Sequence, residues 1–183
     1  EGPGSLRFFN HAMQISAKNR ASLESDMRVA LVKQQFYLDY QPQVATDGHV
    51  LGVEALVRWR HPDNGLISPA QFIGVAESSA LIIPLGRWIL EQACQQIADW
   101  HNDAVFSTWT MAVNVSARQF QQENFVDDVA EVLRATGASP RRLELELTES
   151  LLVSDVNLVE LKMNQLAQLG VKFALDDFGT GYS

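Results

Sequence analysis

A regular alternation of apolar strands and amphipathic helices in the second half of the chain restricts its fold more than any other feature. The pattern predicts helices over 125–136 and 158–169, and strands over 111–116, 143–148 and 171–177. Gly137 and Gly170 follow the two helices, at the position where a glycine often ends a helix. Because strands that alternate with helices pair in parallel through helical crossovers, the sequence predicts an α/β fold.

The first half of the chain predicts a helix followed by a β-hairpin. Apolar residues at helical spacing indicate a first helix over 22–33, with Ser22 as its N-cap. Two segments, over 36–44 and 50–60, are rich in aromatic and branched residues and flank a Thr-Asp-Gly turn, as the strands of a hairpin do. The second strand is expected to end in a turn-rich loop over 60–65.

Two more helices are expected before the alternating segment. Ser68, Pro69 and Gln71 supply an N-cap, a first-turn proline and a capping-box glutamine for a helix that runs toward Ser79. A longer helix follows Pro84, and its apolar stripe predicts core packing rather than a cofactor site. An open doubly wound sheet and a (β/α)8 barrel both fit this order of elements. The absence of a G-x-G-x-x-G motif after the first strand weakens the nucleotide-binding sheet.

Charge and composition exclude several classes of function. The net charge of -8 makes the surface repel a polyanion, so bulk binding to DNA or RNA is not expected. No apolar run in the sequence approaches the roughly 20 residues that a membrane-spanning helix needs. The single cysteine, Cys94, lies among apolar residues at helical spacing, which indicates a buried structural thiol rather than a nucleophile.

Carboxylate and amide side chains recur near the ends of the expected strands. Glu54 lies on the second hairpin strand, and the later strands end near the residues Asn114, Glu146, Glu149, Asp176 and Asp177. Since the carboxyl ends of parallel strands share one rim, these groups are expected to converge. Oxygen ligands of this kind suit Mg2+ or Mn2+, and two such ions could support the hydrolysis of a phosphodiester.

Each of these motifs also has a structural interpretation. The alternation over 143–148 is typical of a strand with one wet face, and Asn114 could be a turn former at a strand end. The Asp-Asp-Phe-Gly sequence from Asp176 could be a glycine turn. A kinase D-F-G motif is excluded, because no H-R-D loop occurs upstream in the sequence.

Two arginines follow Glu54 on the same expected strand. Strand alternation places Arg58 on the same face as Glu54 and Leu56, where its guanidinium group could reach a phosphate. The alternative is that Arg58 and Arg60 are a solvated pair. His61, in a His-Pro turn, is expected to be structural.

Four motifs, in order along the chain, resemble those of the EAL domain family. They are E-A-L-V-R-W-R-H-P from Glu54, N-V-S from Asn114, E-x-T-E from Glu146, and D-D-F-G-T-G-Y-S from Asp176. The similarity extends from about residue 36 to the end of the chain. It implies a TIM-like (β/α)8 barrel with one antiparallel strand, of which these residues would form the first five or six strands.

The resemblance further implies a metal-dependent phosphodiesterase that hydrolyses cyclic di-GMP to linear pGpG. Its catalytic residues would be Glu54, Asp176 and Asp177, and its ligands for Mg2+ or Mn2+ would be Glu54, Asn114, Glu146, Asp176 and Asp177. Contacts to the dinucleotide would come from Gln41, Leu56 and Arg58, and Glu149 would hold the loop after the fifth strand. A non-catalytic receptor for cyclic di-GMP is the alternative function.

The family pattern also divides the chain into three parts. Residues 1–5 are expected to be a tag scar or linker, 6–34 a connector and first helix, and 35–183 the N-terminal part of an EAL domain. Because a whole barrel needs about 250 residues, the chain is expected to be a fragment that is itself inactive. The family implies a homodimer, with upstream GGDEF or sensor domains in a cytoplasmic parent protein that other parts could tether to a membrane.

Overall fold

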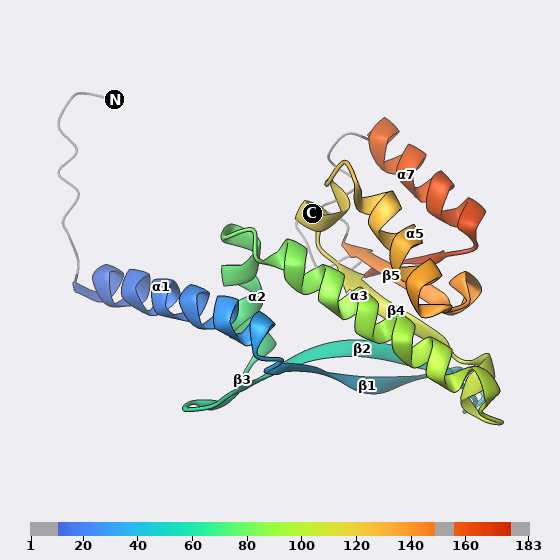
Figure 1. Cartoon of the computed structure of the whole chain (residues 1–183), viewed down its shortest axis with the longest axis horizontal. Coiled ribbons are helices and arrows are strands. Elements are labelled where there is room, and N and C mark those ends of the chain that lie inside the picture. Colours follow the sequence, from blue (N-terminus) through green and yellow to red (C-terminus); the bar gives the residue numbers. More distant parts are fainter. Residues whose placement is uncertain (1–10, 149–155, 177–183) are drawn as a thin grey trace.

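The computed structural model describes the backbone of residues 11–148 and 156–176, and the side chains of residues 18–147 and 156–175 (Figure 1). The helices are α1 (His11–Val32), α2 (Pro69–Ser78), α3 (Ile82–Asp99), α4 (Ala117–Phe120), α5 (Phe125–Thr136) and α7 (Val156–Leu169). The strands are β1 (Phe36–Val44), β2 (Val50–His61), β3 (Gly65–Ile67), β4 (Thr110–Val115), β5 (Leu143–Thr148) and β6 (Lys172–Asp176). Short 3-10 helices at Trp100–Asn102, Phe106–Thr108 and Pro140–Arg142 lie in the connections.

The strands form one mixed sheet in the order β1-β2-β4-β5-β6, with β3 paired to β2. Strands β1 and β3 run antiparallel to β2, whereas β2, β4, β5 and β6 are parallel to one another. From β2 onward the spatial order follows the chain order without reversal. A doubly wound sheet would reverse its order at a switch point, so this topology favours a barrel. The α/β prediction is confirmed.

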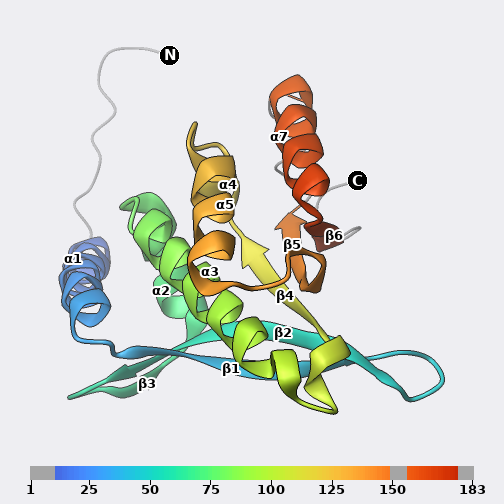
Figure 2. The ribbon, with the colours of Figure 1, turned by 45° about the vertical axis from the view of Figure 1, so that its right-hand side comes forward.

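The two faces of the sheet differ in chemistry, because alternate residues of a strand point to opposite sides. On one face, the side chains from β4 and β5 are almost completely buried, and they are Met111, Val113, Val115, Leu143, Leu145 and Leu147. Helices α3, α5 and α7 lie side by side over this apolar face (Figure 2). The strand register places Gln41, Glu54, Asn114 and Glu146 on the opposite face. The apolar face holds the core, and polar groups occupy the other face.

The sheet is strongly curved. Gln43 on β1 donates a hydrogen bond from Nε2 to Oε1 of Glu146 on β5 at 3.2 Å, although β2 and β4 lie between these strands. In a flat sheet, three strand spacings would separate β1 from β5 by roughly 14 Å. The contact therefore requires the strands to tilt and curl toward one another, as they do in a barrel.

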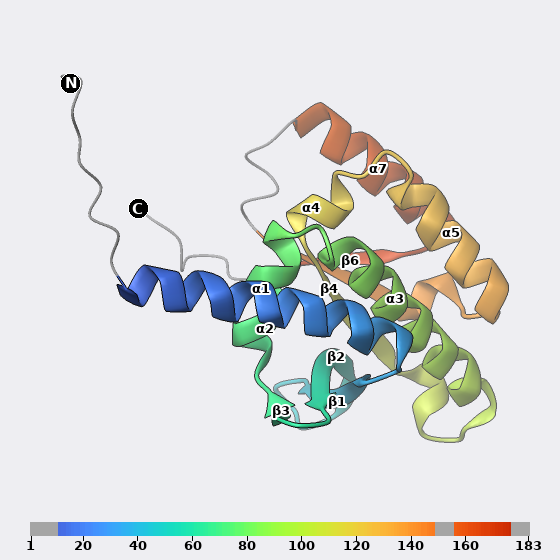
Figure 3. The ribbon, with the colours of Figure 1, turned by 60° about the vertical axis from the view of Figure 1, so that its left-hand side comes forward.

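Helix α1 differs from the prediction, because it begins at His11 and Ser22 is an interior residue rather than an N-cap. Its buried side chains include Met27 and Ala30, and α1 packs across α2 (Figure 3). Residues 18–22 are exposed and continue the helix without an apolar stripe, so hydrophobic periodicity does not reveal them. None of the helices within residues 11–148 and 156–176 combines the length and the hydropathy that crossing a membrane requires.

The other predicted elements are confirmed with small changes in their boundaries. The hairpin pairs as expected, and α5 and β5 span the predicted residues. The expected capping glutamine is in place, because Gln71 Oε1 accepts the Ser68 N–H at 3.3 Å. The loop prediction for 60–65 was wrong in part: β2 continues to His61, and the three-residue strand β3 pairs back onto its end.

Candidate functional site at the carboxyl ends of the parallel strands

Strands β2 and β4 bring Glu54 and Asn114 into direct contact. Asn114 Nδ2 donates to Glu54 Oε1 at 2.6 Å, across 60 positions of sequence. In the parallel register Glu54 lies opposite Ala112, so Asn114 is two residues further toward the carboxyl end on the same face. A carboxylate and an amide from two different strands thus meet where the motifs indicated a shared site.

Glu146 on β5 extends this group by one more strand. Glu146 pairs with Asn114 in the β4–β5 register, and its carboxylate accepts the hydrogen bond from Gln43. Sequence analysis did not single out Gln43. No local pattern could have identified it, because the contact spans 103 positions and depends on the curvature of the sheet.

The backbone of Asp176 continues the same register on β6. Asp176 pairs with Thr148, and Ala174, two residues earlier, pairs with Glu146. Because residues two positions apart on a strand share a face, the backbone position of Asp176 lies on the face that carries Glu146. The side chain of Asp176 is not described, and Asp177 and Glu149 lie outside the described residues. Among side chains 18–147 and 156–175, no three His, Cys, Asp or Glu residues gather closely enough to form a metal cluster.

The three residues expected to contact a dinucleotide lie on the hairpin. Gln41 pairs directly with Glu54, and Leu56 pairs with Asp39. Arg58 donates from Nε to Asp39 Oδ2 at 2.8 Å and from Nη1 to the carbonyl oxygen of Val57 at 3.0 Å. Because Asp39 orients this guanidinium group and is itself 53% exposed, the solvated-pair interpretation of Arg58 is replaced by an ion pair at the surface.

A cavity of about 360 Å³ opens beside these residues, between the ends of β2 and β4 and helices α2 and α3. Leu56, Arg58 and Asn114 all line it. Its walls are largely apolar, with Ile73 and Ile89 among them. A concave apolar space with a few polar groups at its edge is the usual form of a small-molecule site. Three of the residues selected from sequence therefore share one cavity.

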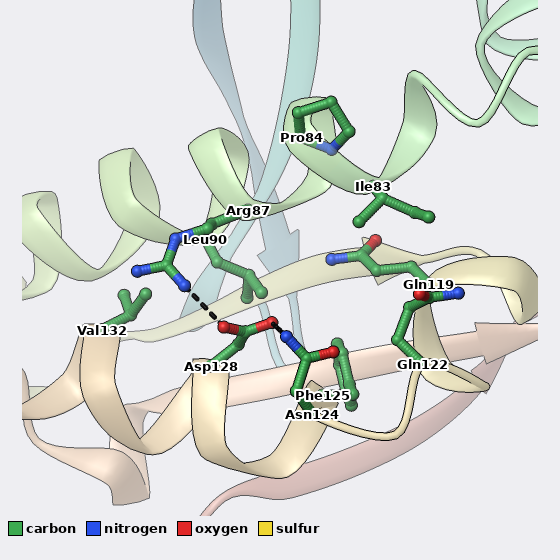
Figure 4. A pocket seen from close by; sticks show the side chains of 10 residues that line it. All are labelled: Ile83, Pro84, Arg87, Leu90, Gln119, Gln122, Asn124, Phe125, Asp128 and Val132. Atoms are coloured by element: carbon green, nitrogen blue, oxygen red, sulfur yellow. Dashed lines mark hydrogen bonds and ion pairs between the residues drawn. The ribbon is translucent and has the colours of Figure 1, made fainter.

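A second cavity, of about 290 Å³, lies between α3, α4 and α5 on the outer side of the helices (Figure 4). Arg87 at its edge contacts Asp128 at 2.5 Å, Glu131 at 2.8 Å and Glu91 at 3.0 Å. The hydrogen bond from Arg87 lowers the pKa of Glu131 below its ordinary value. Because three carboxylates already neutralise Arg87, this group joins α3 to α5 rather than presenting a cation to a ligand.

Two reactive side chains are structural, as their sequence context predicted. Cys94 on α3 is completely buried, and burial raises the pKa of its thiol to about 12. His61 is 8% exposed, and its Nδ1 accepts the backbone N–H groups of Asp63 and Asn64 at 3.1 and 3.2 Å. The imidazole thus closes the turn after β2.

Comparison with known proteins identifies relatives that match the whole of this chain. The bifunctional diguanylate cyclase/cyclic di-GMP phosphodiesterase MucR of Pseudomonas aeruginosa is 42% identical over 100% of this chain and 27% of its own length. The cyclic di-GMP phosphodiesterase PdeR of Escherichia coli is 38% identical, again over 100% of this chain and 27% of its own length. The chain therefore spans about a quarter of the length of these relatives.

A solved structure shows the same fold. The PaMucR phosphodiesterase in a c-di-GMP complex superposes with a TM-score of 0.83 at 44% identity, over 88% of this chain and 66% of that one. The pattern of the EAL domain family matches residues 24–183, which include every strand of the sheet and all the polar residues at its carboxyl ends. The chain belongs to the EAL domain family.

Proposed function

We propose that this chain provides the first part of the active site of a phosphodiesterase that hydrolyses cyclic di-GMP to linear pGpG. The observation that carries the proposal is the contact of Glu54 with Asn114, with Glu146 on the adjacent strand. The relatives named as cyclic di-GMP phosphodiesterases support the substrate class.

The proposed cofactor is a pair of Mg2+ or Mn2+ ions. The residues that would hold them are Glu54, Asn114, Glu146, Asp176 and Asp177. The donor set fits, because carboxylate and amide oxygens are the ligands that these hard cations prefer. When bound, the cations would lower the pKa of a water molecule and neutralise charge on the phosphate. Acidic residues on neighbouring strands also repel one another less when cations lie between them.

The remaining residues would bind and orient the substrate. Arg58 would exchange the exposed carboxylate of Asp39 for a phosphate group, and the planar guanidinium group can donate two parallel N–H groups to two of its oxygen atoms. Gln41, beside Glu54 on the hairpin, and Leu56, on the cavity wall, would contact the dinucleotide. Glu149 would fix the loop after β5. We further propose a homodimer, with GGDEF or sensor domains upstream, in the cytoplasm.

The decisive experiment measures conversion of cyclic di-GMP to pGpG by the intact protein with Mg2+, with Mn2+ and with a chelator. We expect turnover that requires the metal. Glu54→Ala should lower turnover by orders of magnitude, whereas Glu160→Ala, which removes an exposed carboxylate from α7, should not. The 183-residue chain assayed beside the intact protein tests whether these residues suffice. Tight binding of cyclic di-GMP without turnover by the intact protein would refute the enzyme and support a receptor.

A further inference from the structure

We propose that Gln43 is a positioning residue that sets the orientation of the Glu146 carboxylate for a divalent cation. The inference rests on the proposed function and adds a residue to it. Gln43 on β1 lies on the same face of the sheet as Glu146 and reaches it past β2 and β4, through the 3.2 Å hydrogen bond between Nε2 and Oε1. Both side chains are partly buried, so the contact is shielded from bulk water more than a surface pair is.

The local structure of the hairpin directs Gln43 toward this contact. The β1–β2 register shifts between Gln43 and Val44, so Val44 pairs with Val50 while Gln43 pairs with Gly52. Such a bulge changes the direction in which neighbouring side chains point. Gly52 has no side chain, and a Cβ atom there would lie 2.3 Å from the carbonyl oxygen of Thr110. On β2, the position that pairs with Gln43 therefore carries no side chain that could block its path toward β5.

The chemistry of the pair explains what Gln43 contributes. A glutamate on a strand has several rotatable bonds, and a ligand must hold its oxygen atoms close to one geometry. The amide N–H of Gln43 fixes Oε1 of Glu146 from outside the set of groups proposed to hold the metal. Partners of this kind are typically worth about 10- to 100-fold in metal affinity or activity. The same contact ties β1 to β5, which links the geometry of Glu146 to the curvature of the sheet.

The test uses three variants of the intact protein. Gln43→Met keeps the length of the side chain and removes the donor. Gln43→Asn keeps the amide but shortens the side chain by one methylene, so its donor cannot reach the 3.2 Å contact. Gln92→Met makes the same exchange at an exposed position on α3 and serves as the matched control. Urea unfolding of each variant verifies that it is folded.

The first readout is binding of Mn2+, titrated by electron paramagnetic resonance in the absence of substrate. We expect Gln43→Met and Gln43→Asn to bind Mn2+ about 10- to 100-fold more weakly, with Gln92→Met unchanged. The second readout is turnover: both Gln43 variants should need more Mn2+ for half-maximal activity, with little change in KM for cyclic di-GMP at saturating Mn2+.

The outcomes separate this inference from the proposed function. If folded Gln43→Met binds Mn2+ as tightly as the unsubstituted protein, Gln43 does not position Glu146. Full affinity in Gln43→Asn would also overturn the inference, because an amide that cannot reach Glu146 would then be sufficient. If the unsubstituted protein binds Mn2+ but does not hydrolyse cyclic di-GMP, the proposed function fails, and the titrations still decide the role of Gln43. Failure of the unsubstituted protein to bind Mn2+ would overturn both.

Discussion

Replacing Gly52 by alanine should destabilise the protein, because β2 and β4 lie so close at this residue that no side chain fits between them. A Cβ atom on Gly52 would lie 2.3 Å from both the carbonyl oxygen and Oγ1 of Thr110, and 2.9 Å from its carbonyl carbon. The hydroxyl group of Thr110 could rotate away, but its carbonyl group belongs to the strand itself. The two strands must therefore move apart where Gly52 pairs with Thr110.

The expected magnitude follows from two opposing effects. Overpacking at a site that cannot relax costs about 1–3 kcal/mol. Alanine also restricts the unfolded chain more than glycine does, which stabilises the folded state by about 0.4–1 kcal/mol. The central values, about 2 and about 0.7 kcal/mol, leave a net loss of about 1.3 kcal/mol in the free energy of unfolding. A second consequence is local: Glu54 lies two residues beyond Gly52, so its hydrogen bond to Asn114 should weaken as β2 moves.

Urea unfolding followed by circular dichroism measures this loss. The matched control is Gly74→Ala on α2, because Gly74 is exposed and a Cβ atom there would have no neighbour within 4 Å. Higher helix propensity should stabilise that variant by up to about 1 kcal/mol. The two alanine substitutions thus have opposite expected signs. If Gly52→Ala is as stable as the unsubstituted protein, the strand approach at Thr110 does not require glycine, and the reasoning is wrong.

Two further predictions concern the helices. Cys94 should not react with a thiol reagent at about pH 8 in the folded protein, because it is fully buried and burial raises its pKa to about 12. Unfolding the protein in urea should make it reactive. Fast labelling without urea would contradict its burial. Arg87→Met should lower the urea midpoint at neutral pH. Because Arg87 lowers the pKa of Glu131, the stability from this contact is complete above the ordinary pKa of glutamate and is lost as pH falls through the lowered value. The midpoint difference should therefore shrink in acid, and a pH-independent difference would exclude this ion pairing.

Sequence reasoning predicted correctly the elements that have a regular hydrophobic periodicity and a residue that ends them. Helix α5 carries a buried apolar stripe and ends at Gly137, whose φ of 73° is in the left-handed region that glycine favours. Strand β5 alternates strictly between apolar and polar residues. In both, the pattern of burial is already present in the sequence. Residues 18–22 of α1 are exposed and have no such pattern, so the helix over His11–Val32 was predicted only from residue 22 onward.

The polar contacts of the candidate site were predictable only in part. Motifs identified Glu54, Asn114 and Glu146, and the parallel register explains why they share a face. The partner of Arg58 depends on which hairpin residue lies diagonally opposite, and the partner of Glu146 depends on the curvature of the sheet. Both are properties of assembled strands rather than of any one segment. Sequence analysis therefore suggested the chemical groups of the site but not the side chains that hold them.

The division of the sheet into an apolar and a polar face has a consequence for how this protein can change over generations. Within a single strand such as β4, the residues that keep the domain folded alternate with Asn114, a residue of the candidate site. During evolution, the residues of the core could therefore be substituted without changing the adjacent residues of the site, and the reverse. Relatives that abandon catalysis could keep the fold intact, and relatives that adapt to heat could repack their interior without altering what they recognise.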